Sequence, residues 1–454
     1  MDSASLKLSR YTLRVANEDG TYLLYNTFSG SLAHIDSEDD ETIGKALAGQ
    51  PLTPDNEELI ADLREALILR PQTADENHEI REWYDAVRVN THQMNLTLLT
   101  TNACNMACAY CFEGEALKGT HMPEPVAKAV VQWAERKLGL LKPSELFVRF
   151  FGGEPFINPK GVLALAREFH RITTIQNVRL RMAATTNGTR LSRELIEELT
   201  RLGLESVKVT LDGDEERHNE KRPLKNGQNG FQTIWKNLES IQNLVQFDIN
   251  VNAEPKDAPS IGRLLPVLSQ SSFRPAIRSL KIQPLRRINP ELGDHDLRMT
   301  PEVASTVRMW QETAHLGGYQ PASPLDGSPC EIHRGSHFTV DPKGDLYPCA
   351  QLIGRPSARI GSIFTDEIAP ENAESFLFFR RHDPLNHPKC SVCSYFPICG
   401  GGCRAATFTL DRNQAETFNC PVNLLDLTVP AAIREQYKTT LSSSSETNQQ
   451  KENV

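Results

Sequence analysis

The sequence predicts an α/β protein whose main domain is a parallel sheet, curled as a partial or full (β/α) barrel or opened as a doubly wound sheet. Amphipathic helical stretches separate six candidate strands between residues 96 and 285: LTLLTT, ELFVRFF, VRLRMAATT, SVKVTL, FDINVNA and SLKIQPL. Such alternation is typical of parallel sheets. Polar or glycine-rich segments follow several of these strands, and the carboxyl edge of such a sheet is where chemistry usually lies.

The regions on either side of this repeat differ from it. Residues 1–90 predict a small α+β domain, with two short strands in YLLYNTFSGSLAHID and an amphipathic helix in NEELIADLREALIL. Residues 325–425 hold seven cysteines with many glycines and prolines, and a loop-rich segment of this kind usually needs a metal to stabilise it. We therefore expect domains at 1–90, 91–324 and 325–425, followed by a polar, disordered tail at 426–454.

Composition excludes several classes of function. The formal net charge of −9 gives no basic surface for nucleic acid, and no apolar run reaches the length of a membrane helix. The chain begins without a charged-then-apolar signal segment, which favours a cytoplasmic protein. Ten cysteines in that compartment indicate metal binding or catalysis instead of disulfides.

The first cysteine cluster follows the first candidate strand as Cys104-Asn-Met-Ala-Cys108-Ala-Tyr-Cys111. Three thiolates this close together can hold three irons of a [4Fe-4S] cube and leave the fourth iron for an outside ligand. The alternative is a zinc site or buried structural thiols, although structural zinc normally takes four closed ligands.

This loop resembles the signature of the radical S-adenosylmethionine (SAM) superfamily, which implies a partial (β/α)6, TIM-like barrel. In that family the open iron binds SAM, and an electron from the cluster cleaves it to a 5'-deoxyadenosyl radical that removes hydrogen from the substrate. Gly152-Gly153-Glu154-Pro155 resembles the family's GGEP motif. A second segment, Thr210-Leu-Asp212-Gly213 followed by His218 and Arg222-Pro223, is similar to the family's S-L-D-G…H-x3-R-P.

The resemblance implies SAM-binding roles for six residues. The backbone of Gly152 and Gly153 and the carboxylate of Glu154 would receive the SAM ammonium, and Tyr110 would lie near the adenine or pack in the loop. Thr210 and Arg222 would bind the ribose or carboxylate, since an arginine fork suits a carboxylate. For Asp212 and His218 we favour a structural role. No general base stands out, so the catalytic residues stay unknown.

The C-terminal cysteines resemble the seven-cysteine pattern of SPASM domains, which normally carry two auxiliary [4Fe-4S] clusters. Zinc is the alternative for a C-x2-C pair. The resemblance implies the following ligands: Cys330, Cys349 and Cys403 for auxiliary cluster I, and Cys390, Cys393, Cys399 and Cys420 for auxiliary cluster II. Ten cysteines then divide as three, four and three, so the fourth iron of cluster I is either open to a substrate thiolate or held by water or another side chain.

Enzymes similar to this pattern mostly modify ribosomally made peptides or proteins. The leading hypothesis is a peptide maturase that forms a thioether or carbon–carbon crosslink, with residues 1–90 binding a leader peptide as an added strand or serving as a structural cap. The implied partners are a precursor peptide and an electron donor such as flavodoxin or ferredoxin. A formylglycine-forming sulfatase maturase is disfavoured, because Ala350 follows Cys349 where those enzymes carry an aspartate. A non-catalytic iron-sulfur electron carrier would leave the GGEP motif and Arg222 without a purpose.

Overall fold

The centre of the molecule is a nine-stranded sheet in the order β11-β10-β9-β8-β7-β6-β12-β13-β14. The computed structural model describes residues 5–111, 113–114, 119–285, 301–316, 318–319, 323–327, 329–365, 368–381, 383–410 and 420–452. The first six strands along the chain are β6 (Gln93–Leu99), β7 (Glu145–Phe151), β8 (Arg179–Thr186), β9 (Leu204–Thr210), β10 (Gln246–Ala253) and β11 (Ile277–Pro284). These six pair parallel in chain order. The predicted parallel sheet is confirmed, and it is open, with β11 and β14 at its edges.

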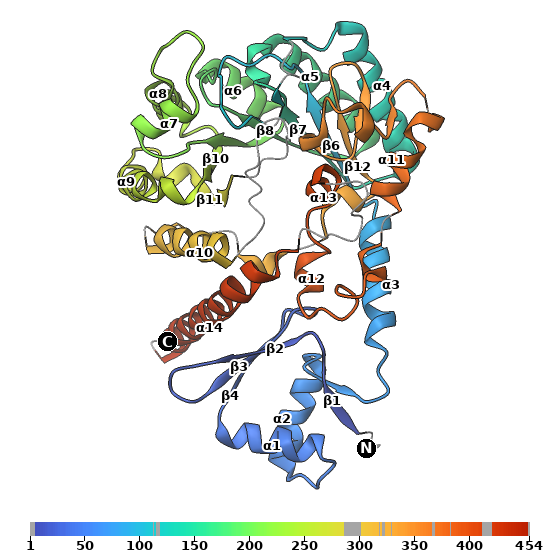
Figure 1. Cartoon of the computed structure of the whole chain (residues 1–454), viewed down its shortest axis with the longest axis vertical. Coiled ribbons are helices and arrows are strands. Elements are labelled where there is room, and N and C mark those ends of the chain that lie inside the picture. Colours follow the sequence, from blue (N-terminus) through green and yellow to red (C-terminus); the bar gives the residue numbers. More distant parts are fainter. Residues whose placement is uncertain are drawn as a thin grey trace.

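Helices follow one another in an arc around the outside of this sheet (Figure 1). They are α4 (Glu124–Leu141), α5 (Pro159–Gln176), α6 (Arg193–Arg201), α7 (Glu215–Lys221), α8 (Gly230–Ile241), α9 (Ala258–Ser269) and α10 (Pro301–Leu316). Helix α6 shows how the sequence dictates them: the Ser192 side chain caps its amino end, and Ile196 and Leu199 at helical spacing are fully buried. The largest hydrophobic core lies between these helices and the sheet.

The amino-terminal region forms a separate small sheet with helices, at the lower end of the molecule in Figure 1. Its elements are β1 (Leu6–Leu8), β2 (Thr12–Ala16), β3 (Tyr22–Asn26), β4 (Leu32–Ile35), β5 (Leu69–Pro71), α1 (Ser37–Leu47), α2 (Pro54–Glu65) and α3 (Glu76–Val89). Strands β2, β3 and β4 are antiparallel neighbours. The two strands and the helix that the sequence predicts here are present as β3, β4 and α2.

The carboxy-terminal cysteine region is joined to the barrel sheet. Its elements are β12 (His337–Val340), β13 (Asp345–Tyr347), β14 (Gly361–Ser362), α11 (Pro370–Arg380), α12 (Phe396–Cys399) and α13 (Arg404–Leu410). Strand β12 pairs parallel with β6, and β13 and β14 extend the sheet as antiparallel strands. The sequence gives no sign of this shared sheet, because the pairing joins residues more than 200 positions apart.

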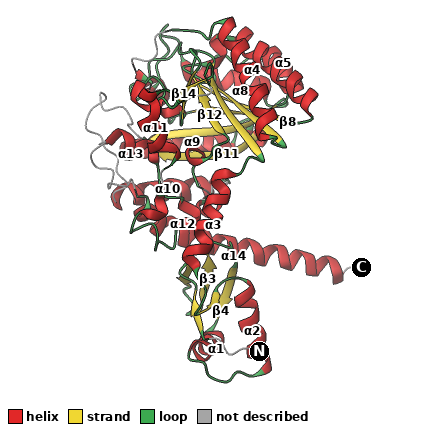
Figure 2. Cartoon of the chain, turned by 90° about the vertical axis from the view of Figure 1, so that its right-hand side faces the viewer, coloured by secondary structure: helices red, strands yellow, loops and turns green. Residues whose placement is uncertain are grey.

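The predicted disorder of residues 426–454 is wrong where helix α14 (Val422–Glu452) packs on the protein. Val429 and Ile433 are completely buried, in a hydrophobic cluster with Val15 and Leu23 of the amino-terminal sheet. These two residues lie four apart on one helical face, so burial compensates for the polar composition around them. The end of α14 extends away from the body of the molecule (Figure 2), and residues 453–454 lie outside the described part.

Candidate active site

The loop that carries Cys104, Cys108 and Cys111 begins where β6 ends, at the carboxyl edge of the sheet. Segments on both sides hold its backbone: Asn102 N–H donates to the Thr120 carbonyl (2.8 Å), and Ala107 N–H donates to the Pro223 carbonyl (2.9 Å). All three thiols are half-buried. The loop is therefore fixed in place by the fold.

Gly152 and Gly153 pack directly on the backbone of this cysteine loop. A Cβ atom at Gly152 would lie 2.2 Å from the Thr101 carbonyl oxygen, and one at Gly153 would lie 2.4 Å from that of Ala103. The Gly153 and Glu154 N–H groups donate to these same two oxygens, at 3.1 and 2.8 Å. Any side chain would clash here, so the glycines serve the chain's own backbone, a role that sequence reasoning missed.

Glu154 is completely buried and is used by the chain itself. Its carboxylate accepts hydrogen bonds from Asn187 N–H (2.6 Å) and the Thr186 hydroxyl (2.8 Å). Burial raises the pKa of this carboxyl, against the lowering effect of these hydrogen bonds. The side chain thereby ties the end of β7 to the end of β8, and its SAM-binding role stays a prediction.

Asn187 and Asn105 form a hydrogen-bonded network behind Cys104. The Asn187 side-chain amide donates to the Asn105 side-chain oxygen (2.8 Å) and points at the Cys104 sulfur at 3.9 Å. The Asn105 amide donates in turn to the Thr189 hydroxyl (2.8 Å). In the sequence, Thr186-Asn187-Gly188 is one of the polar segments that follow the candidate strands, but nothing in the sequence indicates that it contacts the cysteine loop.

Tyr110, Asp212 and Arg222 meet at the same edge of the sheet. Arg222 donates to the Tyr110 hydroxyl oxygen (2.7 Å), and that hydroxyl donates to the Asp212 carboxylate. Burial raises the pKa of Tyr110 well above its usual value, so the phenol keeps its proton for this bond. A cavity of about 180 Å³ adjoins the ring of Tyr110.

His218 and Thr210 have different surroundings. His218 is buried, and its Nδ1 accepts a hydrogen bond from the Asp212 N–H (3.2 Å). Burial lowers the pKa of this imidazole well below its usual value, which suits a neutral acceptor. This contact is structural, as expected. Thr210 ends β9 beside the other predicted SAM contacts, and no partner of its hydroxyl is found within the described chain.

The carboxy-terminal cysteines form two groups in space. Repulsion between neighbouring thiolates adds to burial in raising the pKa of Cys390 and Cys349, each to about 12. The neighbours that contribute differ: Cys390 is affected by Cys393, Cys399 and Cys420, whereas Cys349 is affected by Cys330 and Cys403. The structure thus brings together the same four and three cysteines that the SPASM resemblance assigns to two clusters.

The described chain tests the metal assignments only indirectly. No three His, Cys, Asp or Glu side chains within it converge on a point where a single metal ion could lie. The donor set does fit iron-sulfur chemistry, because thiols grouped by three and by four are the ligands that such cubes use. The ligand assignments themselves stay a proposal.

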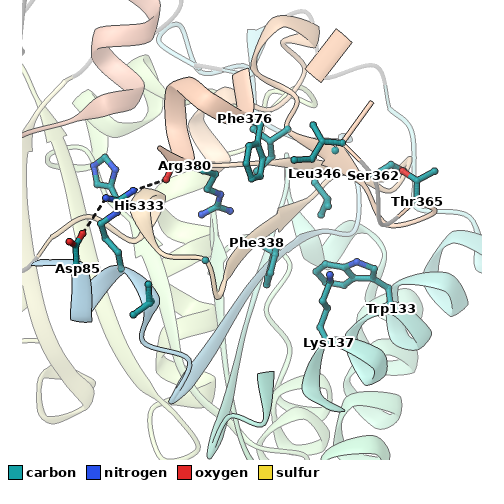
Figure 3. Close-up of a pocket in the computed structure, with 16 residues that line it drawn as sticks. Asp85, Trp133, Lys137, His333, Phe338, Leu346, Ser362, Thr365, Phe376 and Arg380 are labelled. Atoms are coloured by element: carbon teal, nitrogen blue, oxygen red, sulfur yellow. Dashed lines mark hydrogen bonds and ion pairs between the residues drawn. The ribbon is translucent and has the colours of Figure 1, made fainter. Parts of the chain in front are cut away.

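A larger hollow of about 670 Å³ lies away from these residues (Figure 3). It is lined by Trp133 of α4, Phe338 of β12, Phe376 of α11 and the end of α3. Arg88 crosses from α3 to donate to the Arg380 carbonyl (2.8 Å). None of the predicted site residues lines this hollow.

Among the described helices, none is long and apolar enough to cross a membrane.

Comparison with known proteins agrees with this geometry. Residues 98–251 match the family model of the Radical SAM superfamily. Mycofactocin maturase MftC from Mycolicibacterium smegmatis is 24% identical over 330 residues, covering 69% of this chain and 78% of that protein. A cysteine-type anaerobic sulfatase-maturating enzyme from Clostridium novyi is 22% identical over 339 residues, covering 66% of this chain and 85% of that enzyme.

A solved structure has the same fold. The structure of native anSMEcpe with bound AdoMet aligns with a TM-score of 0.57 and 19% identity, covering 76% of this chain and 100% of that chain. The chain therefore contains a radical SAM domain, and the two relatives named above are maturases.

Proposed function

We propose that this protein is a radical SAM/SPASM oxidoreductase that modifies a ribosomally made peptide by forming a thioether or carbon–carbon crosslink. The observation that carries the proposal is the division of its ten cysteines. Three lie on a hydrogen-bonded loop at the carboxyl edge of a parallel sheet, and seven lie in two groups of the carboxy-terminal region. The Tyr110–Asp212–Arg222 arrangement at the same edge supports it.

The residues that would hold the cofactors lie on the described strands and loops. Cys104, Cys108 and Cys111 would ligate the first [4Fe-4S] cluster, and the carboxy-terminal groups would ligate the two others. When bound, the cluster and SAM would supply a 5'-deoxyadenosyl radical for hydrogen removal. Arg222 is already oriented by Tyr110 and Asp212, so its fork is positioned for the SAM carboxylate or ribose before SAM arrives. The Asn187 amide would hydrogen-bond the Cys104 sulfur and orient that ligand.

The partners follow from the same proposal. A structure of anSMEcpe contains both AdoMet and a Cp18Cys peptide, with a TM-score of 0.57 to this chain. We infer a peptide substrate here, with the β2-β3-β4 sheet as a docking edge for a precursor's leader segment. An electron donor such as flavodoxin or ferredoxin and a cytoplasmic location complete the proposal, since reduced thiols and clusters need that compartment.

A formylglycine-forming enzyme is the second candidate, favoured by the similarity to sulfatase-maturating enzymes. Against it stands Ala350, which follows Cys349 and offers no carboxylate. Incubating the reconstituted enzyme with a Cys-containing sulfatase-motif peptide distinguishes the two. Formylglycine detected by mass spectrometry would favour this candidate over crosslinking.

The central experiment is anaerobic reconstitution followed by iron and sulfide counting and a SAM cleavage assay with a reductant. We expect about twelve irons per chain, for three four-iron cubes, and 5'-deoxyadenosine as a product. About four irons with cleavage would mean that the carboxy-terminal cysteines hold something else. Full iron loading without SAM cleavage would contradict the proposed enzymatic activity and favour the electron-carrier hypothesis.

A further inference from the structure

The barrel strands have two chemically different faces. Alternate side chains of β7, β9 and β11 belong to the main core under the helices; they include Val148, Val207 and Leu280. Because successive strand residues point to opposite faces, the side chains between them point away from the helices. We call this opposite side the inner face of the sheet.

Besides arginines that are paired with carboxylates, such as Arg181, three cationic residues of the described strands lie on the inner face: Arg149 of β7, Lys208 of β9 and Lys281 of β11. We call them the cationic row. Lys208 and Lys281 are exposed, and Arg149 is half-buried. Lys208 comes two residues before Thr210, which ends the same strand, so Lys208 lies about 7 Å below the sheet edge where SAM is predicted to bind. The strand register places Arg149 level with Ser206 and Lys281 level with Thr210, so the row runs diagonally across the sheet with Lys208 at its middle.

The carboxylates that the described strands place on this side of the sheet are already engaged. Asp248, which pairs in register with Lys208, accepts hydrogen bonds from Arg278 (3.0 Å) and the Ser279 hydroxyl (2.7 Å). Nearer the amino ends of the strands, Arg181 bridges Glu145 (3.3 Å) and Glu205 (2.7 Å).

Two members of the row are left without a carboxylate partner in the described part of the chain. Neither Arg149 nor Lys208 has an ion pair with another described residue. Burial and then the nearby Arg149 and Lys281 lower the pKa of Lys208. Lys208 is thus recessed among protein atoms although solvent reaches it, and the fold holds like charges together at an energetic cost. Such a cost is characteristic of binding sites.

We propose that the cationic row binds a carboxylate of the peptide substrate. This inference rests on the proposed function and specifies its substrate class: peptides with an acidic group close to the residue that loses hydrogen. An extended peptide advances about 3.3 Å per residue, so the 7 Å offset of Lys208 from the sheet edge corresponds to about two residues. Arg149 offers a planar fork for both carboxylate oxygens, and Lys208 adds charge that the carboxylate would neutralise.

The carboxylate could be an Asp or Glu side chain or the carboxyl end of the peptide. Three small probes separate these sources: N-acetyl-aspartate N-methylamide, N-acetylalanine and the neutral N-acetylalaninamide. The reconstituted full-length enzyme is treated anaerobically with an amine-acetylating reagent at constant ionic strength. Mass spectrometry then gives the acetylation rate of each lysine, and exposed Lys160 on helix α5 serves as the internal control.

We expect a carboxylate probe at four times its Kd to slow acetylation of Lys208 about fivefold, with no change at Lys160. Arg149→Gln should raise the Kd of the probe about tenfold and so weaken the protection. Arg193→Gln on helix α6 should leave the protection unchanged. Protection by the aspartate probe alone assigns a side-chain carboxylate, and protection by N-acetylalanine alone assigns the peptide's carboxyl end. Protection by both supports the shared chemistry.

Equal acetylation rates with the carboxylate probes and the neutral amide would overturn the inference, and so would full protection in Arg149→Gln. The assay needs no turnover. Loss of the proposed function would appear separately, as absent SAM cleavage in an enzyme whose cationic row still binds the probes.

Discussion

The two cysteine-bearing regions of this protein are built by different means. The loop with Cys104 follows a strand of a parallel sheet, and backbone hydrogen bonds to neighbouring segments hold it. The carboxy-terminal cysteines lie among short helices and turns, and two of them, Cys330 and Cys420, are exposed. Regular secondary structure thus positions the first set. The second would depend more on the iron-sulfur clusters proposed for it and on hydrophobic clusters shared with other regions.

The largest effect expected from this comparison is at the first region. Replacing Cys104, Cys108 or Cys111 by alanine should abolish SAM cleavage, because three thiolates are the minimum that holds a cube with one open iron. Chromatographic detection of 5'-deoxyadenosine measures this. Cys393→Ala is the matched control from the other region and should retain cleavage. Production close to wild type by a Cys104 variant would disprove the assignment of the first cluster.

A partial effect is expected at the second region. Cys349→Ala should lower the iron content by about four per chain and block product formation, while SAM cleavage continues uncoupled from substrate. Iron analysis and mass spectrometry of the peptide product measure the two quantities. If the product yield were unchanged, auxiliary cluster I would have no part in the reaction.

The smallest effect concerns the backbone that supports the first region. Gly153→Ala should lower the free energy of unfolding by about 2 kcal/mol and reduce occupancy of the first cluster, since its Cβ would overlap the Ala103 carbonyl. Chemical unfolding and iron analysis provide the measurements. Gly262→Ala on helix α9 is the control, because no atom lies within 4 Å of its added Cβ, and it should stabilise slightly. Equal stability of the two variants would show that the close approach is unimportant.

The sequence by itself determined the parallel sheet, its six strands and the clustering of the cysteines. These follow from local rules, namely the alternation of apolar residues, the caps of helices and the spacing of thiols along a few residues. The Tyr110 and Arg222 positions also came from a motif resemblance.

Only the tertiary structure decided how distant segments meet. The pairing of β12 with β6, the burial of Ile433 against the amino-terminal sheet, and the contact of Gly153 with Ala103 join residues from about 50 to more than 400 positions apart. The engagement of Glu154 by Asn187 and the cationic row of the inner face depend on strand order and register. Local sequence patterns do not contain this information, because it arises when chain segments compete for burial and hydrogen-bond partners during folding.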